Sequence, residues 1–298
     1  MISKMLKKQI NYAKLILNLI AFSHSIFALP FALGSFIVAY KKGALVDLKI
    51  DIYLIAKIVL AIIFARAAAM TFNRIIDRQI DGKNPRTEIR ELPSGKITLL
   101  EANLLLAACV SLFFLFAYLI GAHCLILAPM VMGLLLAYSY TKRVTYLSHI
   151  FLGLCLGLSA GGAWWVIRPI VEVAPLVLMS AVIFWVAGFD ILYSCQDIKF
   201  DQDEGLYSIP AKFGLKKAFF ISRVFHIAAA ILLIIYGYSS DQSQSYYFYI
   251  ITIIALLFYQ HSIISPDNLK RIDRAFFTTN GLISLIFLIG IIYSNLLP

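Results

Sequence analysis

The chain has 298 residues, of which 61% are hydrophobic and 14% charged, and its mean hydropathy is +0.86. This composition excludes an ordinary soluble domain and a disordered chain, and it is typical of a protein that crosses a membrane several times. The net charge of +10 fits basic cytoplasmic loops, so no nucleic-acid partner is expected. The four cysteines lie scattered in or beside apolar runs, which indicates neither a disulfide framework nor a zinc site.

Nine apolar runs are long enough to cross a bilayer. They predict an all-α, polytopic membrane protein that forms a single domain over residues 1–298, with spans at 15–40, 51–72, 97–120, 123–141, 147–167, 174–195, 217–238, 246–264 and 275–296. Most lysines and arginines fall in loops on one side, and the other side holds only Lys41, Lys42, Lys49 and Arg168. This bias places the N-terminus in the cytoplasm, and nine spans then put the C-terminus outside. Trp164 and Trp165, followed by Arg168, predict an interfacial belt on the outer side.

Two short polar segments interrupt the apolar sequence, and each carries a pair of carboxylates. NRIIDRQID ends the second span with Asp77 and Asp81, one and two turns after Asn73, and YSCQDIKFD ends the sixth span with Asp197 and Asp201. Residues four apart on a helix point to the same side, and carboxylates at membrane depth are rarely kept without a function. These side chains predict a cytoplasmic site for a hard divalent cation, most simply Mg²⁺ holding a phosphorylated substrate.

Each pair is followed by a hydrophilic loop, at residues 82–97 and 202–217, that mixes basic residues with Pro and Gly. Such a composition is typical of ordered loops that can close over a site. Arg86, Arg90 and Lys212 are each able to reach a diphosphate, and the arginines can pair with it bidentately. The alternative is that these charges only follow the positive-inside rule.

Together these segments resemble the UbiA superfamily of intramembrane aromatic prenyltransferases, over essentially the whole chain. NRIIDRQID matches the first aspartate-rich motif of the family, with Arg74 where many members have Asp. NPRTEIRELPSGKI resembles the RT-x-x-R-P-L signature, with Glu91 where Pro is usual. YSCQDIKFDQDEGLYSIPAKFG matches the second motif and its Ile-Pro-x-x-x-Gly loop, and YSYTKRVT provides a Tyr138-x-x-x-Lys142 element between the two motifs.

The resemblance implies a bundle of nine transmembrane helices and a Mg²⁺-dependent enzyme that uses a polyprenyl diphosphate. The metal and nearby cations neutralise the departing diphosphate, which lets the allylic C–O bond ionise. The resemblance further implies that the carbocation alkylates a phenol ring beside its hydroxyl. Lys142 and Arg90 are the first candidates for cationic help to the diphosphate. Tyr138 and Tyr193, each one turn before a charged motif residue, can hydrogen-bond the phosphate or the acceptor.

Two further charges lie inside predicted spans. Arg66 precedes Asn73 by seven residues on the same helical face, so it can approach the diphosphate or pair with a carboxylate. Asp190 precedes Asp197 by seven residues and is a candidate to orient the acceptor's hydroxyl or to take the ring proton. The alternative for both is that each answers a neighbouring charge and has only a structural role.

The acceptor is an aromatic hydroxy acid by resemblance. The whole-chain pattern is most similar to bacterial 4-hydroxybenzoate polyprenyltransferases, which favours 4-hydroxybenzoate and a place in ubiquinone or menaquinone biosynthesis. REL in place of RPL also resembles a branch associated with menaquinone synthesis through futalosine, whose acceptor would be a dihydroxynaphthoate. Beyond the substrates and the lipid bilayer, no obligate protein partner is expected.

Two other classes of function remain as alternatives. An ion-coupled secondary transporter would place its acids at the bilayer midplane in broken helices, whereas these acids lie at helix ends beside basic loops. A non-catalytic lipid-binding protein leaves the order of three separate polar elements unexplained.

Overall fold

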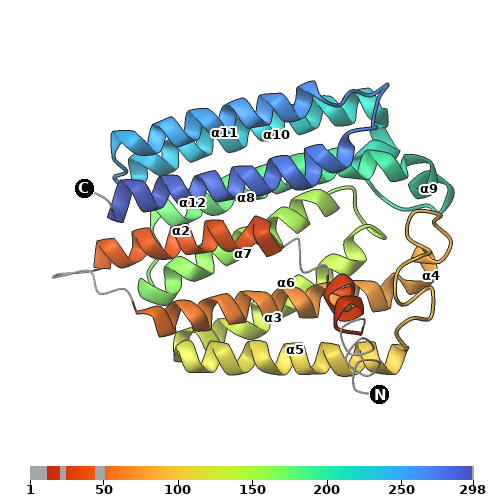
Figure 1. Ribbon diagram of the computed structural model, residues 1–298, viewed down its shortest axis with the longest axis horizontal. Helices are drawn as coiled ribbons and strands as arrows, with labels where there is room; N and C mark the ends of the chain where they lie inside the picture. Colours follow the sequence, from red (N-terminus) through yellow and green to blue (C-terminus); the bar gives the residue numbers. More distant parts are fainter. Residues whose placement is uncertain (1–11, 21–24, 44–50, 297–298) are drawn as a thin grey trace, which may run out of the picture. The chain divides into compact units, whose positions relative to one another are not determined.

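The computed structural model describes residues 12–20, 25–43 and 51–296. Within these residues every long element is a helix (Figure 1), and the one β feature is an isolated bridge between Ser265 and Asn268. The all-α prediction is therefore confirmed. The chain divides into two compact units, one of Met1–Ser25 with Ala56–Ser139 and one of Ile26–Ile55 with Tyr140–Pro298. The single domain stays a prediction.

Among the described residues, seven helices are long and apolar enough to cross a membrane. They correspond to the second to seventh and the ninth predicted spans: Ile52–Ile76, Leu99–Ile120, Ala122–Thr141, Ser148–Ile167, Val173–Asp203, Ile209–Ser239 and Arg274–Leu296. The eighth predicted span corresponds to α11 (Gln244–Ser262). The first predicted span, 15–40, overlaps the helical residues 12–19 and helix α2 (Ser25–Gly43). Residues 21–24 of this span lie outside the described part of the chain. A polytopic membrane protein is confirmed, and the count of nine stays a prediction.

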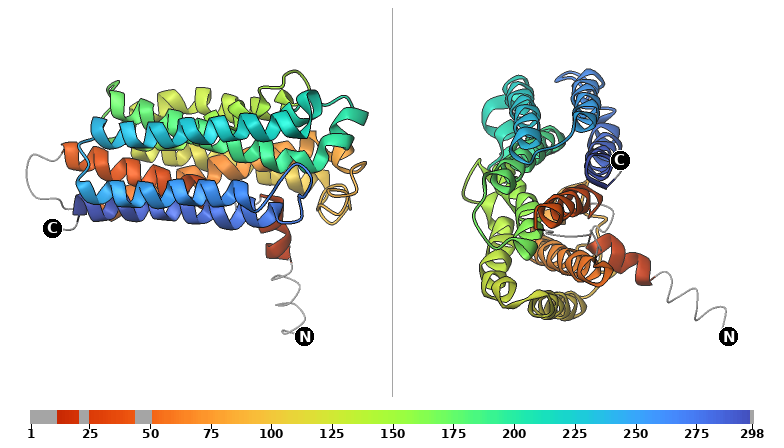
Figure 2. Two further views of the ribbon diagram at one scale, coloured as in Figure 1. Left: turned by 90° about the horizontal axis from the view of Figure 1, so that it is seen from above. Right: turned by 90° about the vertical axis from the view of Figure 1, so that its left-hand side faces the viewer.

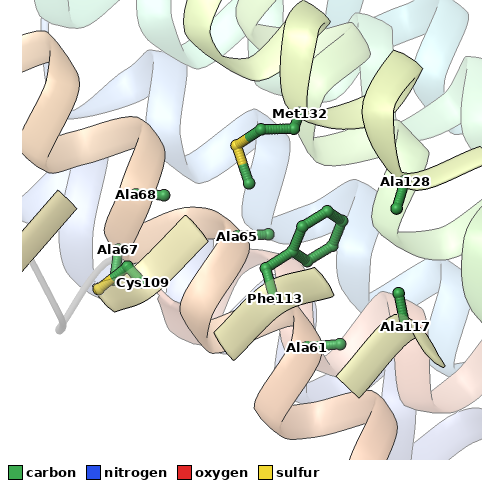
Figure 3. Close-up of a cluster of buried hydrophobic side chains, with 9 residues drawn as sticks. All are labelled: Ala61, Ala65, Ala67, Ala68, Cys109, Phe113, Ala117, Ala128 and Met132. Atoms are coloured by element: carbon green, nitrogen blue, oxygen red, sulfur yellow. The ribbon is translucent and has the colours of Figure 1, made fainter. Parts of the chain in front are cut away.

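The first unit is built on α3 (Ile52–Ile76), α5 (Leu99–Ile120) and α6 (Ala122–Thr141). Its core contains several alanines of α3 and the larger side chains of Phe113 and Met132 (Figure 3). Small residues let the larger side chains approach the helix backbone. Such close packing helps to hold helices together in a membrane, where no hydrophobic driving force acts between them. Gly121 alone separates α5 from α6, so a single residue connects these two helices.

A capping box begins α5. The Thr98 hydroxyl accepts a hydrogen bond from the backbone of Glu101, and the Glu101 carboxylate accepts one from the backbone of Thr98 (2.7 Å). Both donors would otherwise be unpaired at the helix start. Leu92 and Ile97, from the preceding loop, pack with Ala102 and Leu19 in a small buried cluster. The loop after the first carboxylate motif is therefore fixed at its far end.

The second unit has α8 (Val173–Ser194) at its centre, packed on α7 (Ser148–Ile167) and on α10 (Ile209–Ser239). Helices α11 and α12 (Asn280–Leu296) run side by side (Figure 2). Gly214 interrupts the helical geometry of α10 with φ of +76°. Only glycine adopts this conformation without strain, so the glycine of the Ile-Pro-x-x-x-Gly segment makes the bend between a short first turn and the membrane span.

Glycines every fourth residue bring α7 close to α8. A Cβ added at Gly153 would collide with the backbone carbonyl of Ile183, and one added at Gly157 would lie 3.0 Å from the carbonyl oxygen of Met179. Residues four apart share one helix face, so Gly153 and Gly157 together provide the close approach. Packing through small residues is the usual means of helix association in a membrane.

An ion-pair cluster joins helix ends of the second unit. Arg168 donates to both oxygens of Glu172 (2.9 Å each), and Trp164 Nε1 donates to Oε2 of the same carboxylate (2.6 Å). Arg168 also donates to the carbonyl of Lys42 at the end of α2, and Lys42 pairs with Asp241 (2.8 Å). Trp164 is fully buried, so its prediction as an interfacial residue is wrong: its indole packs inward because Glu172 accepts its N–H.

Because of this cluster, we expect part of the free energy of unfolding to decrease at low pH. The hydrogen bonds from Arg168, with a smaller contribution from Trp164, lower the pKa of Glu172. A carboxylate whose folded pKa lies below its unfolded value of about 4.3 stabilises the fold above that value and loses the effect as the pH falls through the folded pKa. We expect Glu172→Gln to cost about 1 kcal/mol at pH 7 and progressively less at low pH. Thermal unfolding in detergent from pH 7 to pH 3 measures the difference, and a difference that does not change with pH would contradict it.

Candidate active site

The first carboxylate motif lies where α3 ends. The Asn73 amide donates to Asp77 Oδ2 (2.8 Å), and Asp77 precedes the short helix α4 (Arg78–Asp81). The backbone N–H of Asp81 donates to the carbonyl of Asp77 (2.7 Å), so the helical path continues through the motif. The expected grouping of Asn73, Asp77 and Asp81 on successive turns is therefore present in the first unit.

Asp81 is paired with an arginine of the following loop. Its carboxylate is nearly buried, and Arg90 Nη1 lies 2.6 and 2.7 Å from its two oxygens. Arg74, in the position where many family members have Asp, lies farther away, at 3.9 Å from Asp81 Oδ2. The Thr87 hydroxyl donates to the Asp81 carbonyl (3.0 Å), and Asn84 accepts from the backbone of Arg86 (2.9 Å). The loop is thus folded against the motif and presents Arg90 to it.

Two arginines of α3 are buried without full hydrogen bonding. Within the described chain, the Nε atoms of Arg66 and Arg74 have no hydrogen-bond partner. Arg66 interacts electrostatically with Tyr138 of α6. A buried, incompletely paired guanidinium is costly, which makes Arg66 a candidate to bind an anionic group of a substrate.

The second carboxylate motif lies beyond the end of α8. A 3₁₀ turn, η2 (Cys195–Asp197), leads into the short helix α9 (Ile198–Asp203), and both Asp197 and Asp201 are buried. Asp201 Oδ2 accepts a hydrogen bond from Ser208 Oγ (2.7 Å). Ser208 also caps α10, because its Oγ accepts from the backbone of Ala211. One serine therefore ties the second motif to the start of the next helix.

The predicted lysines have different surroundings. The backbone carbonyl of Lys142 accepts from the N–H of Tyr207 (2.7 Å), and its side chain is close enough to act electrostatically on Asp201. The ammonium of Lys212 lies 4.0 Å from the centre of the Tyr146 ring. Such a cation–π contact holds the Lys212 side chain. The charge of Lys142 thus acts on the second motif. Lys212 belongs to the start of α10, which follows this motif, and there it contacts Tyr146.

Asp190 has a partner that the sequence analysis missed. Its Oδ2 lies 2.7 Å from Nδ1 of His149, a fully buried residue in the first turn of α7. The two residues are 41 positions apart, and nothing in the local pattern joins them. The one available signal was an imidazole within an apolar span, where polar groups need partners.

Tyr193 belongs to an aromatic cluster along α8. Its ring centre lies 4.1 Å from that of Phe276, which lies 5.2 Å from Phe189, and Phe189 lies 5.1 Å from Trp185. Phe276 is placed by the π-helical turn η3 (Arg274–Thr279). Single π-helical turns are frequent at functional sites. Trp185, Phe189 and Tyr193 follow each other at intervals of four, so an aromatic face of α8 leads toward Asp197.

Within the described residues, no group of three or more His, Cys, Asp and Glu side chains is assembled for a metal ion. The oxygen donors come instead as carboxylate pairs, one on each motif. Mg²⁺ is usually held by one or two carboxylates together with substrate phosphates and water. Hard oxygen donors in pairs therefore fit Mg²⁺ that is completed by a diphosphate.

Comparison with known proteins identifies the family. The model of the UbiA prenyltransferase family matches residues 27–288. Similar curated proteins are named 4-hydroxybenzoate octaprenyltransferase: that of Photobacterium profundum is 30% identical over 238 residues, 80% of this chain and 83% of the relative. That of Escherichia fergusonii is 28% identical over 243 residues, 82% and 83% of the two chains.

Solved structures show the same fold. The apo structure of a UbiA homologue from Aeropyrum pernix has a TM-score of 0.79 and 32% identity and covers 90% of this chain and 97% of that one. A homologue from Archaeoglobus fulgidus bound to GPP and Mg²⁺ has a TM-score of 0.74 and 20% identity and covers 94% and 99%. The protein is thus an enzyme rather than a transporter or a lipid-binding scaffold, and the chain belongs to the UbiA prenyltransferase family.

Proposed function

We propose that this enzyme transfers a polyprenyl group from a polyprenyl diphosphate to 4-hydroxybenzoate, in ubiquinone or menaquinone biosynthesis. The observation that carries the proposal is the pair of carboxylate motifs at helix ends, each beside basic side chains, in a chain whose curated relatives are named 4-hydroxybenzoate octaprenyltransferase. The A. fulgidus homologue, with GPP and Mg²⁺ bound, supports a prenyl diphosphate and a divalent cation as ligands.

The residues assigned to the metal are oxygen donors of both motifs. They are Asn73, Asp77, Asp81, Asp197 and Asp201. Mg²⁺, when bound, neutralises the diphosphate and so helps the allylic C–O bond to break. Asp81 forms an ion pair with Arg90. If Mg²⁺ took the place of Arg90 at this carboxylate, Arg90 would be available to pair with the diphosphate.

The cations assigned to the diphosphate are Arg66, Arg86, Arg90, Lys142 and Lys212. Preorganised positive charges aimed at the leaving group stabilise the charge that develops as the C–O bond breaks. Tyr138 and Tyr193 are assigned to hydrogen bonds with the phosphate or the acceptor. Asp190 is assigned to the acceptor.

We assign the protein to the cell inner membrane, with the N-terminus and the active site on the cytoplasmic side. The support is the concentration of lysines and arginines in the loops that follow both motifs. Cysteine-scanning with a membrane-impermeant thiol reagent tests this orientation. A cysteine at exposed Ser94 should be labelled only from the cytoplasmic face, and one at exposed Val171 only from the opposite face.

The second candidate acceptor is a dihydroxynaphthoate. The observation that favours it is Glu91 in the REL sequence, where Pro is usual. Both acceptors are hydroxylated aromatic acids, so the same carboxylates and cations would serve either reaction. The difference between them lies in the size of the ring system.

Membranes containing the enzyme, a polyprenyl diphosphate and Mg²⁺ decide between the two acceptors. With each offered separately, we expect a prenylated product of 4-hydroxybenzoate together with diphosphate release, and no product in EDTA. Product only from the dihydroxynaphthoate would overturn the favoured acceptor in favour of the second candidate. Absence of product with both, from correctly inserted protein, would contradict the whole proposal.

A further inference from the structure

Both ring nitrogens of His149 are engaged. The backbone N–H of Ile209 donates to Nε2 (3.3 Å), and Nδ1 lies 2.7 Å from Asp190 Oδ2. A backbone amide can only donate, so Nε2 accepts and carries no proton. The proton of the neutral ring is therefore on Nδ1, which donates to the carboxylate. This arrangement fixes the tautomer of His149 and the orientation of Asp190.

The pair is connected to the second carboxylate motif. Ile209 is the first residue of α10, and its neighbour Ser208 donates to Asp201 (2.7 Å). His149 thus joins the first turn of α7, the C-terminal part of α8 and the start of α10. The start of α10 therefore contacts both acids: Ile209 supports Asp190 through His149, and Ser208 binds Asp201 directly.

Asp190 retains one oxygen for a ligand. Its side chain is 16% exposed, whereas that of His149 is fully buried. Among the described residues, Oδ2 is bound by His149, and no side chain or backbone group is found as a hydrogen-bond partner for Oδ1. Asp190 lies on α8, one residue after Phe189 and three residues before Tyr193. Carboxylates inside membrane helices usually mark functional sites.

On the basis of the proposed function, we propose that Asp190 Oδ1 accepts a hydrogen bond from the ring hydroxyl of the aromatic acceptor, and that His149 is the positioning residue that holds Asp190 for this contact. The hydrogen bond orients the ring and raises the electron density at the carbon beside the hydroxyl. The negative charge of Asp190 repels the acid group of the acceptor, so the ring enters with its hydroxyl toward α8. Free phenols are thereby selected over their ethers.

The test compares the acceptor that the wild-type enzyme prenylates with the O-methyl ether of the same acceptor, used as a competitive inhibitor. A carboxylate cannot donate to the ether oxygen, so the ether should bind at least about tenfold more weakly than the acceptor. In Asp190→Asn the side-chain amide can donate to the ether, and the difference should shrink to about threefold or less. An undiminished preference in Asp190→Asn would overturn the proposal.

His149 variants separate positioning from a merely structural role. His149→Leu should raise KM for the acceptor about tenfold and leave KM for the prenyl diphosphate within about twofold. His149→Asn, whose amide can replace the Nδ1–H donor, should recover most of the loss. Ser148→Ala is the matched control, because the buried Ser148 hydroxyl has no hydrogen-bond partner in the described structure. An equal rise in KM for both substrates in His149→Leu, with no recovery in His149→Asn, would show that the His149–Asp190 pair is only structural. This result would overturn the positioning role of His149.

Different results would overturn the proposed function and the contact of Asp190 with the acceptor. If the wild-type enzyme prenylates neither 4-hydroxybenzoate nor a dihydroxynaphthoate, the proposed function fails, and the contact with Asp190 fails with it. If it prenylates one of them while the ether preference does not depend on residue 190, the proposed function stands and only this inference fails.

Discussion

Asp77→Asn and Asp197→Asn are each expected to lower prenyl transfer by at least about 100-fold, while the protein still inserts in the membrane. Asparagine keeps the shape of the side chain and can still accept a hydrogen bond, so the bond from Asn73 to Asp77 can persist in the first variant. What is lost is the negative charge that we propose binds Mg²⁺. Initial rates of product formation at saturating polyprenyl diphosphate and acceptor measure the effect.

Asp203→Asn provides the matched control for these two variants. Asp203 is also an acid of α9, two residues after Asp201, but its side chain is exposed and belongs to neither carboxylate pair. Its loss should change the rate by less than about twofold, since exposed charges contribute little. Near-normal rates in Asp77→Asn or Asp197→Asn would remove that residue from the metal site.

Gly153→Ala is expected to be the most damaging single methyl addition to α7. The new Cβ would collide with the backbone carbonyl of Ile183 on α8, and backbone cannot move aside as a flexible side chain can. Overpacking of this kind costs about 2–3 kcal/mol, which corresponds to a fall in the thermal midpoint of roughly 5 °C or more. Thermal unfolding of the purified protein in detergent measures it.

The same helix offers the control at Gly162. No heavy atom lies within 4 Å of a Cβ added there. Gly162→Ala should therefore leave the stability unchanged or raise it by up to about 1 kcal/mol, because alanine has less freedom to lose on folding. Equal midpoints for Gly153→Ala and Gly162→Ala would show that the close approach of α7 and α8 contributes nothing to stability.

Helix positions were largely predictable because each span is a long apolar run bounded by polar residues. The third and fourth predicted spans, 97–120 and 123–141, correspond to α5 and α6 within two residues. The first carboxylate motif was predictable for a related reason, since Asn73, Asp77 and Asp81 are four residues apart and local helix geometry alone brings them together.

Contacts between distant segments could not be predicted from the sequence. The pairing of His149 with Asp190 depends on how α7 packs on α8, and this in turn depends on which glycines face a neighbouring helix. Trp164 shows the same difficulty: an aromatic residue near a span end usually lies at the interface, but here the indole is buried and donates to Glu172. Local patterns specify elements, and long-range packing specifies which of their side chains meet.

Mg²⁺-dependent binding of a prenyl diphosphate tests the central claim most directly, because it requires the carboxylates without requiring any acceptor. A prenyl thiolodiphosphate, which ionises too slowly to react, can be titrated onto the purified enzyme over a range of Mg²⁺ concentrations. The account predicts binding that needs Mg²⁺, disappears in EDTA and is lost in both Asp77→Asn and Asp197→Asn but not in Asp203→Asn. Equally tight binding in EDTA, or in both variants, would contradict the proposed role of the two motifs in Mg²⁺-dependent binding.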